Sequence, residues 1–590
     1  MHNLGVMHEG SREPPGTLTG ATQLLVPFHG ERAVEAPMTL GQLAVLQRLQ
    51  HGAPAPATLE RAIEVPAGCR TDDVAETFAV LLTRHEGLRT RYDEGGRRTQ
   101  RVLRTGVLHV QRHAIERAPG APVGPGTHRA ALVAWLTGRL RSEPLDAATS
   151  LPVRVAVATR GDQVIAIVVC CSQLAVDAEA MEVVARDAAT MLRDPAVRRV
   201  GARRLQPVDR AEAEAAAPLR ARAAGALEHW ATGLASMPPL AWAAPARSPG
   251  GSVEVELASP AAAVAVRHVA LRARTSEPTV VLAAVCAVLS AVTGSPRCAF
   301  PLMAGNRGDP ALARYVGTLA QPSLFSLDLA GIGFDTVVRR SHAAMLRAHR
   351  HGLYDVHARV ELQQRIEERR GVRFCLEPVF HNLVVDRRGD DRPPAMVDVL
   401  GRHPRPRLDR RPMPAVRFPL RFTLQDLREA LVLRLWTGDS GRLPVDRMEG
   451  LVLAVHRLLL AAAVTDLTPE QVRAAIDLPP LDRGSGWARL DGCWVELDEV
   501  RGLVEEAVGP CRIAVEPSAD GGGRLVARLL PGATTDVRTP TEAHSRCMAA
   551  LAGHPTATAP AWYVIDGRPV AVEGSGRSAT SARDRAREPA

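Results

Sequence analysis

Two polar side chains and one carboxylate stand where a predicted apolar strand ends and a predicted helix begins. Residues 165–178 read IAIVVCCSQLAVDA, and a helical pattern follows. The hydroxyl of Ser172 would need a neighbouring base before it could attack or take a proton. The amide of Gln173 has no lone pair basic enough to accept a proton near neutral pH. Asp177 is expected to be the N-cap of the helix. The junction therefore offers polar groups but no obvious general base.

The cysteines and histidines do not form a recognisable metal or disulfide pattern. The nine cysteines are odd in number and never spaced as C-x-x-C (69, 170, 171, 286, 298, 375, 493, 511 and 547). Cys170 and Cys171 end the apolar strand, where cysteine is usually an inert hydrophobic residue. A nucleophilic role would need a lowered pKa, and no histidine lies nearby in sequence. Four histidines fall on one predicted helix and the turn after it, without carboxylates or cysteines in a ligand pattern (His342, His349, His351 and His357).

Composition excludes several chemistries. The sequence contains no lysine, so all 73 basic residues are arginines. This excludes a Schiff-base lysine, a P-loop lysine and the catalytic lysine of an adenylating enzyme. The formal charge is +9, but arginines are dense only in 402–412 and 577–588, and aromatic residues make up 3%, so nucleic-acid binding is not expected. An acidic carrier protein would suit the arginines at least as well, because complementary charge speeds docking. The run EERR at 367–370 is expected to be a solvated helix face.

The elements that must position these residues alternate between helices and strands. Around the junction the pattern predicts helices at 37–50 and 129–140 and strands at 152–160 and 163–171. The alternation repeats over 252–462, so the fold class is α/β (α+β). No apolar run approaches the roughly 20 residues of a membrane helix. The first residues have no basic segment leading into an apolar one, so no secretion signal is expected. These features predict a cytoplasmic protein.

We expect six segments along the chain. The first is a loose leader in which 22–28 could add an edge strand, and two lobes, a linker, a small α+β module and a disordered tail follow. Their predicted bounds are 1–36 for the leader, 37–210 and 211–476 for the lobes, 477–486 for the linker, 487–574 for the module and 575–590 for the tail.

Several segments resemble, in the right order, the motifs of condensation domains of nonribosomal peptide synthetases. The most specific is 84–92, RHEGLRTRY, which is similar to R-H-E-A-L-R-T-R-F. Three others are TLGQLAVLQRL at 39–49, similar to S-x-A-Q-x-R-L-W, LEHWATGLA at 227–235, similar to a bridging L-x-x-W segment, and 301–329, similar to P-x-A-G-R... I-G-x-F-V-N-T-L. The resemblance spans residues 37–476. It implies two chloramphenicol-acetyltransferase-like lobes in a V shape, with a tunnel that receives phosphopantetheine arms from two carrier proteins.

At the strand-to-helix junction the family carries His-His-x-x-x-Asp-Gly, which aligns with the segment that begins at Ser172. Only Asp177 is kept, and Gln173 stands at the second histidine. In the family that histidine orients or deprotonates the attacking amine, and the aspartate forms a structural ion pair with an arginine. The resemblance therefore places Ser172, Gln173 and Asp177 at the catalytic positions. Arg89 or Arg307 is the implied ion-pair partner of Asp177. Loss of a general base costs typically about 10²–10⁴ in rate.

Residues 487–574 resemble the small C-terminal subdomain of adenylation domains, on three segments (492–504, 523–531 and 555–576). Trp494 stands where that family has an arginine. Ser575 or Arg577 stands where its catalytic lysine should be. The large ATP-binding subdomain has no counterpart in the sequence. The resemblance therefore implies that this chain does not adenylate a substrate alone.

Two functions remain open at this point. In the first, a degenerate condensation-domain protein fused to an adenylation remnant docks carrier-bound intermediates, or recruits a tailoring enzyme or a synthetase subunit. In the second, the chain forms an amide or ester by positioning alone, because effective molarities reach about 10⁵–10⁸ M for well-oriented pairs. A more distant third is acyl transfer from coenzyme A esters. The chain is expected to bring no cofactor or metal of its own, because phosphopantetheine arrives on peptidyl or acyl carrier proteins. Nucleic-acid and membrane partners are not expected.

Overall fold

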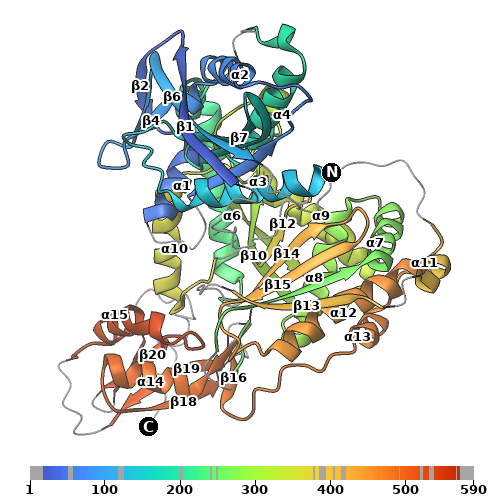
Figure 1. Cartoon of the computed structure of the whole chain (residues 1–590). Coiled ribbons are helices and arrows are strands. Elements are labelled where there is room, and N and C mark those ends of the chain that lie inside the picture. The colour runs from blue at the N-terminus through green and yellow to red at the C-terminus, as the bar shows by residue number, and fades with distance from the viewer. Residues whose placement is uncertain are drawn as a thin grey trace, which may run out of the picture. The chain divides into compact units, whose positions relative to one another are not determined.

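The chain forms two compact units, which are both drawn in Figure 1. The computed structural model describes residues 17–50, 57–116, 125–199, 204–239, 242–246, 250–376, 379–384, 394–402, 405–413, 420–490, 492–517, 523–530, 537–565 and 568–571. Unit 1 comprises Met1–Gly225, Gly305–Gln321 and Gly352–Val356, and unit 2 comprises the remainder. The expected division at residue 210 differs from this, because two short segments of the predicted second lobe pack with the first.

Unit 1 is built on a five-stranded sheet of order β1-β6-β7-β8-β3 and a three-stranded sheet of order β2-β5-β4. In the larger sheet β6 and β7 are parallel, and the other neighbours are antiparallel. The elements are β1 (Thr17–His29), β2 (Val34–Pro37), α1 (Leu40–Gln50), β3 (Thr58–Ile63), α2 (Thr71–Arg84), η1 (Glu86–Arg89), β4 (Thr90–Tyr92), β5 (Thr99–Val102), β6 (Thr105–Glu116), α3 (Pro125–Ser142), β7 (Val153–Arg160), β8 (Gln163–Ser172), α4 (Ala178–Arg193), η2 (Pro195–Val197), α5 (Pro207–Ala215) and η3 (Pro310–Leu312).

Strand β8 is apolar along almost its whole length because both of its faces are covered. Val169 and Cys171 belong to the core that includes residues of α2 and α4. Val168 and Cys170 belong to a second cluster with residues of α3. A strand that is buried on both sides gives a continuous apolar run rather than an alternating one. The predicted strand at 163–171 is therefore confirmed, and the polar junction begins where this buried strand ends.

The expectation of a loose leader is wrong from Thr17 onward. Strand β1 pairs antiparallel with β6 over its full length and forms one edge of the large sheet. It contains the segment 22–28 for which an edge strand was considered. Val26 and Phe28 are buried, because every second side chain of β1 faces the core. The short strand β2 then leads into α1, which lies close to the polar junction.

Unit 2 contains a larger lobe, here called the second lobe, and the C-terminal module, residues 487–571. The second lobe has a sheet of order β12-β14-β15-β9-β13 and a two-stranded sheet of order β10-β11. Its elements are α6 (Ala217–Ser236, which begins in unit 1), β9 (Val253–Ser259), α7 (Pro260–Ala273), α8 (Glu277–Thr293), β10 (Arg297–Ala304), β11 (Gln321–Asp328), α9 (Phe334–Arg350), α10 (Val356–Arg370), β12 (Phe380–Asn382), α11 (Met396–Arg402), β13 (Arg407–Pro412), β14 (Arg421–Asp426), β15 (Leu431–Thr437), α12 (Val445–Val464) and α13 (Pro469–Ile476).

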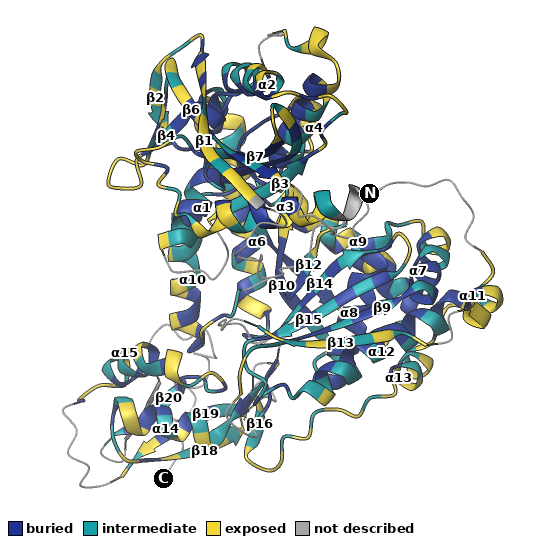
Figure 2. Ribbon diagram, viewed as in Figure 1, coloured by how far each residue is buried: buried dark blue, intermediate teal, exposed yellow. Residues whose placement is uncertain are grey.

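The core of the second lobe lies between its sheet and the helices that pack on it. Helix α8 is buried nearly all round, and it shares one cluster with residues of α7, α12 and β15. Figure 2 shows the contrast with α11, which is exposed on most of its surface. A helix that is apolar on every side is stable only when other elements surround it. The central place of α8 makes its C-terminal end, at Thr293, a rigid point of the lobe.

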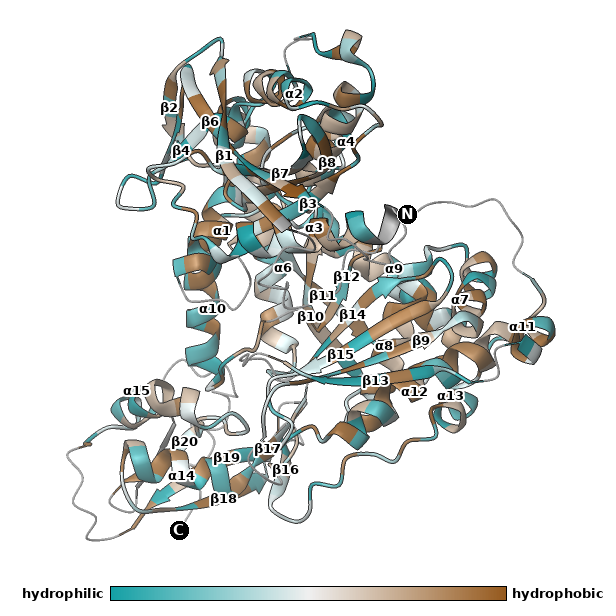
Figure 3. Cartoon of the chain, in the orientation of Figure 1, coloured by the Kyte–Doolittle hydropathy of each residue, from teal (hydrophilic) through white to brown (hydrophobic). Residues whose placement is uncertain are grey.

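The C-terminal end of α10 is hydrophilic, as Figure 3 shows, yet part of it is buried. The expectation that the EERR run is a solvated face is wrong for Glu367 and Arg370, which are 3% and 7% exposed. Arg370 donates to the main-chain oxygens of Leu234 and Met237 at 2.6 and 2.9 Å. Glu367 accepts from the Phe374 amide at 2.9 Å. These bonds satisfy buried polar groups and fix the chain direction after α10.

The described residues of the C-terminal module form two sheets, two α-helices and one short 3-10 helix. The elements are β16 (Trp487–Leu490), β17 (Cys493–Glu496), α14 (Leu497–Ala507), β18 (Cys511–Pro517), β19 (Gly523–Leu529), α15 (Pro540–Ala550), η4 (Leu551–Gly553), β20 (Trp562–Ile565) and β21 (Arg568–Ala571). Strands β18-β19-β20-β21 form one sheet and β16-β17 the other. The module has its own small core, which includes Leu503, Ala527 and Tyr563.

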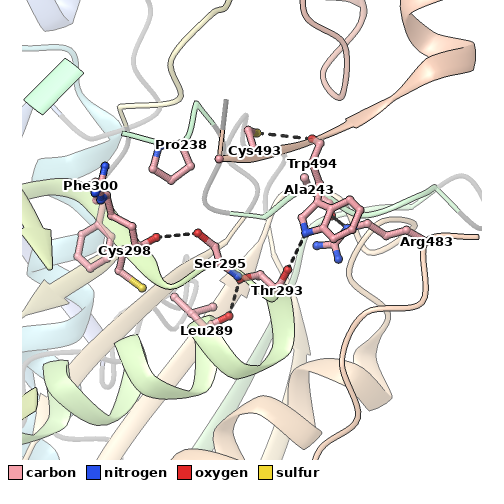
Figure 4. A pocket seen from close by; sticks show the side chains of 13 residues that line it. Pro238, Ala243, Leu289, Thr293, Ser295, Cys298, Phe300, Arg483, Cys493 and Trp494 are labelled. Atoms are coloured by element: carbon pink, nitrogen blue, oxygen red, sulfur yellow. Dashed lines mark hydrogen bonds between the residues drawn. The ribbon is translucent and has the colours of Figure 1, made fainter. Parts of the chain in front are cut away.

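The module contacts the second lobe through β17. The indole N–H of Trp494 donates to the main-chain oxygen of Thr293 at 3.0 Å, and the Arg483 guanidinium lies 4.8 Å from the Trp494 ring centroid (Figure 4). Arg483 also donates to the main-chain oxygen of Ala243 at 2.9 Å. The pocket among these residues has a volume of about 30 Å³, which is room for a water molecule rather than a substrate.

A second contact joins the module to the loop after α10. The Ala559 amide donates to the main-chain oxygen of Gly371 at 2.7 Å, and His544 contacts the Glu368 oxygen at the same distance. Gly371 has a φ of 65°, and a Cβ there would lie 2.7 Å from the Ala559 oxygen. Only glycine combines this left-handed backbone with so close an approach. The module is therefore held at two separate places.

Candidate functional site

The polar junction lies in unit 1, between the end of β8 and the start of α4. Ser172 is the last residue of β8 and pairs with Thr58 of β3. Its main-chain oxygen accepts from the Ala175 and Val176 amides at 2.9 and 3.1 Å, which closes a tight turn. Its side chain is 4% exposed, and the hydroxyl oxygen accepts from the Leu174 amide at 3.2 Å. Ser172 therefore supports the turn from inside the fold.

Asp177 is the N-cap of α4 and also forms a buried ion pair. Its Oδ1 accepts from the Ala180 amide at 2.8 Å and from Arg307 Nη2 at 2.7 Å. Its Oδ2 accepts from the Leu319 and Ala320 amides at 2.9 and 3.3 Å. Both side chains of the ion pair are 6% exposed. A buried carboxylate needs such donors, since an unpaired buried charge is strongly unfavourable.

Arg307 ties this carboxylate to the segment 305–321. Its Nη1 donates to the main-chain oxygens of Leu312 and Tyr315 at 3.1 and 2.8 Å. Its Nη2 donates to the Gly317 oxygen at 3.1 Å as well as to Asp177. One guanidinium thus donates to three main-chain carbonyls and one carboxylate, and it fixes the segment 305–321 against the start of α4.

Arg89 takes no part in this ion pair, so the expectation that it is a partner of Asp177 is wrong. Its Nη2 lies 3.4 Å from Glu86 Oε1, three residues earlier in the chain. Its Nη1 donates to the main-chain oxygens of Arg32 and Leu103. The side chain is 1% exposed. Arg89 therefore joins the η1 turn to the strands beside it, and Arg307 alone of the two contacts Asp177.

Gln173 lies at the surface end of the turn and is half-buried. Its side-chain Oε1 accepts from Arg48 Nη2 at 2.5 Å. Its main-chain oxygen accepts from the Thr318 hydroxyl at 2.5 Å, and its main-chain N–H donates to the Ala57 main-chain oxygen at 2.9 Å. The structure thus brings the Arg48 guanidinium to Gln173, and it brings the Arg307 guanidinium to Asp177, four residues further along the chain.

The family model for the condensation domain matches residues 56–383. The chain belongs to the condensation-domain family. The match includes the junction, Asp177 and its partner Arg307. Arg48 and the C-terminal module lie outside it. No curated protein matches the chain.

Solved structures share the condensation-domain fold at low sequence identity. The condensation domain that mediates chain release from the enacyloxin polyketide synthase is 20% identical to this chain, with a TM-score of 0.52. The likeness covers 74% of this chain and 83% of that chain. The X-domain from teicoplanin biosynthesis is 19% identical, with a TM-score of 0.50, over 76% and 99%. The nonribosomal peptide synthetase FmoA3, in its α-methyl-L-serine-AMP bound form, is 19% identical, with a TM-score of 0.51, over 84% of this chain and 50% of its own length.

Among the residues that the structure describes, the cysteines and histidines considered from the sequence do not gather into a second site. Burial raises the pKa of the Cys170 thiol to about 11 and also raises the pKa of the Cys171 thiol well above its usual value, so neither is a thiolate near neutral pH. His342 contacts the Thr275 hydroxyl at 3.0 Å, and His351 stacks on His229 with ring centroids 4.7 Å apart. Within the described ranges, His, Cys, Asp and Glu form no group of three or more that could hold a metal ion. Ser575 and Arg577 lie outside the described residues.

In the part of the chain that the structure describes, no single helix is long and apolar enough to cross a membrane. Helices α7 and α8 together reach the required length and hydropathy, but they are bent by 101° relative to each other.

Sequence reasoning missed Arg48. It lies in the last turn of α1, beside a segment that was noted only for its resemblance to an opening motif. Its partner Gln173 is 125 residues away in the chain. A basic residue in the last turn of a helix is common, because it interacts favourably with the helix dipole. The local sequence therefore gives no sign that this guanidinium contacts the junction.

Proposed function

We propose that this chain is a condensation-domain-like protein of a nonribosomal peptide pathway that docks carrier-bound intermediates or recruits partner enzymes, without histidine-based condensation. The observation that carries the proposal is the side chain at position 173. Gln173 occupies the place where the family motif has its second histidine, and its side-chain oxygen is held by Arg48. The amide cannot take a proton from an attacking amine near neutral pH.

The other polar side chains of the junction do not replace the missing base. The Ser172 hydroxyl is buried and accepts from the Leu174 amide. A serine would need a base of its own to be activated. The carboxylate of Asp177 is surrounded by four donors, one of them the Arg307 guanidinium. The geometry therefore supports a structural role for Asp177 and favours a site without general base catalysis.

The proposed partners are peptidyl or acyl carrier proteins, which bring the phosphopantetheine arm with them. The chain then needs no cofactor of its own. Its formal charge of +9 comes entirely from arginines, and an acidic carrier would be attracted to it. A tailoring enzyme or another synthetase subunit is the other class of partner in this proposal.

We propose further that the C-terminal module is a remnant of an adenylation domain. The FmoA3 synthetase covers 84% of this chain, whereas the teicoplanin X-domain covers 76%. Trp494, at the position where adenylation subdomains have arginine, contacts Thr293 of the second lobe. This use of the side chain supports a structural module rather than one that works on an adenylate.

A second candidate function is formation of an amide or ester by positioning alone. A condensation domain mediates chain release from the enacyloxin polyketide synthase, so a domain of this fold can act on a chain held by a synthase. The Asp177–Arg307 ion pair keeps the segment 305–321 against α4. Two reactants that are held in good orientation react as if at about 10⁵–10⁸ M. Thioesters are reactive enough for this to produce turnover.

A condensation assay separates the two functions. Acyl-loaded and aminoacyl-loaded carrier proteins from the same gene neighbourhood are mixed with the native protein, and the products are identified by mass spectrometry. Carrier binding without product is expected. Product from the native protein, absent when the protein is omitted, would overturn the docking proposal in favour of positioning. A parallel assay of thiol release from acyl coenzyme A tests the more distant third function.

A further inference from the structure

A single carboxylate of unit 1 contacts three arginines near the C-terminal end of α2. Asp187 lies in the second half of α4, which packs beside α2 (Figure 1). Its Oδ2 accepts from Arg204 Nη1 at 2.9 Å and from Arg84 Nη1 at 3.3 Å. Its Oδ1 accepts from Arg314 Nη2 at 2.8 Å. Three guanidiniums from three separate segments of the chain therefore meet at one side chain, which is 5% exposed.

The charges of this cluster do not cancel. Of the described carboxylates, Asp187 is the one that forms an ion pair with these guanidiniums. His85 Nε2 lies 3.5 Å from Asp187 Oδ2, but burial lowers the pKa of this imidazole, so it is neutral near neutral pH. One guanidinium is enough to neutralise a buried carboxylate, and every guanidinium stays charged. Three positive charges thus meet one negative charge, and the fold does not require this excess.

The excess charge acts on Arg84. Burial lowers the pKa of Arg84, and the charges of Arg204 and Arg314 lower it further against the attraction of Asp187. The Nη2 of Arg84 also donates to the main-chain oxygen of Arg199 at 2.8 Å. Arg199 is exposed, and its side chain forms no ion pair with another described residue. The four arginines are here called the arginine patch (Arg84, Arg199, Arg204 and Arg314).

The outer members of the arginine patch are open to solvent. The side chain of Arg314 is 64% exposed and that of Arg204 is 23% exposed, whereas Arg84 is 12% exposed. Arg314 contacts Asp187 through one nitrogen, and a guanidinium has further N–H groups. The stretch 198–204, RRVGARR, contributes no acidic residue. Acidic side chains of a partner can therefore approach the patch without displacing Asp187.

We propose that the arginine patch docks the acidic surface of a carrier protein. The proposal rests on the proposed function, and it names the surface of this chain that the carrier body contacts. Carboxylates of a partner are attracted by the positive charge that Asp187 leaves uncompensated. Complementary charge of this kind mainly raises the association rate. The contact is made with the folded body of the carrier, so it does not depend on what the phosphopantetheine arm bears.

The variant R199Q/R314Q removes two charges of the patch and keeps its buried part. Both substituted residues are exposed, and Asp187 retains its contacts with Arg84 and Arg204. The matched control is R101Q/R222Q, which removes two exposed arginines of β5 and α6 in the same unit. Equal midpoints of thermal unfolding show that both variants are folded.

Association kinetics of the full chain test the proposal. Native protein and both variants are mixed with a carrier protein from the same gene neighbourhood, in its unloaded and its acyl-loaded form. We expect R199Q/R314Q to associate about tenfold more slowly than the native protein at low ionic strength, with both forms of the carrier. The association rate of R199Q/R314Q should also depend less on salt, because fewer charges remain to be screened. The control should associate at nearly the native rate.

The outcomes separate this proposal from the proposed function. An R199Q/R314Q variant that is slowed no more than the control would overturn the patch, while carrier docking by the chain stands. A loss confined to the acyl-loaded carrier would also overturn it, because the effect would then depend on the arm. Tighter binding of a labelled oligonucleotide than of the carrier would indicate a nucleic-acid partner instead. Failure of the native protein to bind any carrier would overturn the proposed function itself, and this use of the patch with it.

Discussion

Trp494 donates its indole N–H to the main-chain oxygen of Thr293, the last residue of the buried helix α8. The bond satisfies one of the carbonyls that a helix leaves unpaired at its C-terminal end. Arg483 of the linker lies over the same indole ring. The C-terminal module is thus attached to the end of the buried helix α8 of the second lobe, and this attachment can be tested.

Replacement of Trp494 is expected to release the module from the second lobe. W494F keeps most of the ring but removes the donor, which costs about 1 kcal/mol for a lost hydrogen bond. W494A also removes the packing and is expected to cost more. Hydrogen exchange and limited proteolysis of the linker 477–486 measure the release. W562F, which alters a tryptophan inside the module's own sheet, is the control, and equal effects of W562F and W494F would contradict the attachment.

The substitution G371A is expected to disrupt the second contact of the module. Alanine is strained at a φ of 65°, and its Cβ would approach the Ala559 oxygen to 2.7 Å. A cost of about 1–3 kcal/mol in the free energy of unfolding follows from such strain. Urea unfolding followed by tryptophan fluorescence measures it. G553A is a control, since a Cβ there meets no atom within 4 Å. A similar small change in both variants would argue against a close contact at Gly371.

The variant D177N is expected to destabilise unit 1 strongly. It leaves the Arg307 guanidinium buried, at 6% exposure, without its carboxylate. Removal of one partner of a buried ion pair costs about 3–5 kcal/mol. Urea unfolding measures the change, and D72N, at an exposed residue of α2, is expected to change stability by less than about 0.5 kcal/mol. A loss in D177N no larger than in D72N would refute the structural role.

The buried His456 is expected to make stability depend on pH. Burial lowers the pKa of His456 to about 4, with a further contribution from Arg457. An unfolded histidine titrates near about 6.5, so below that pH the unfolded state binds a proton that the folded state does not. The contribution of His456 to stability should therefore be fully present above pH 7. Between pH 7 and pH 5 the free energy of unfolding should fall by about 2 kcal/mol because of this residue alone.

The variant H456Q tests this assignment. Glutamine retains a polar partner for the Ser259 hydroxyl, which lies 3.1 Å from the histidine ring, but it does not titrate. The difference in unfolding free energy between pH 7 and pH 5 should be about 2 kcal/mol smaller in H456Q than in the native protein. An identical pH dependence in both proteins would show that His456 is not the responsible group.

The junction itself was predictable from local sequence. The continuous apolar run before Ser172 indicated a buried strand, and Asp177 was expected to be the N-cap of the following helix. These features depend on neighbours in the chain and on the general rule that a buried strand is apolar throughout. The α/β alternation of both lobes followed from the same kind of pattern.

The contacts that decide the chemistry were not predictable, because their partners are far apart in sequence. Gln173 contacts Arg48 across 125 residues, and Asp177 contacts Arg307 across 130. Arg89 was an equally good partner for Asp177 on sequence grounds, but Glu86 lies beside it in the η1 turn. Glu367 and Arg370 read as a solvated face, and only the fold brings α6 and the loop after α10 against them.

The way in which Asp177 uses its two oxygens has a consequence for protein engineering. All four of its donors come from α4 and from the segment 305–321, and none comes from the side chain of Gln173. The four contacts that hold this carboxylate therefore do not depend on the side chain at position 173. Position 173 can be randomised together with position 48, in a library that keeps Asp177 and Arg307, without removing any of these four contacts.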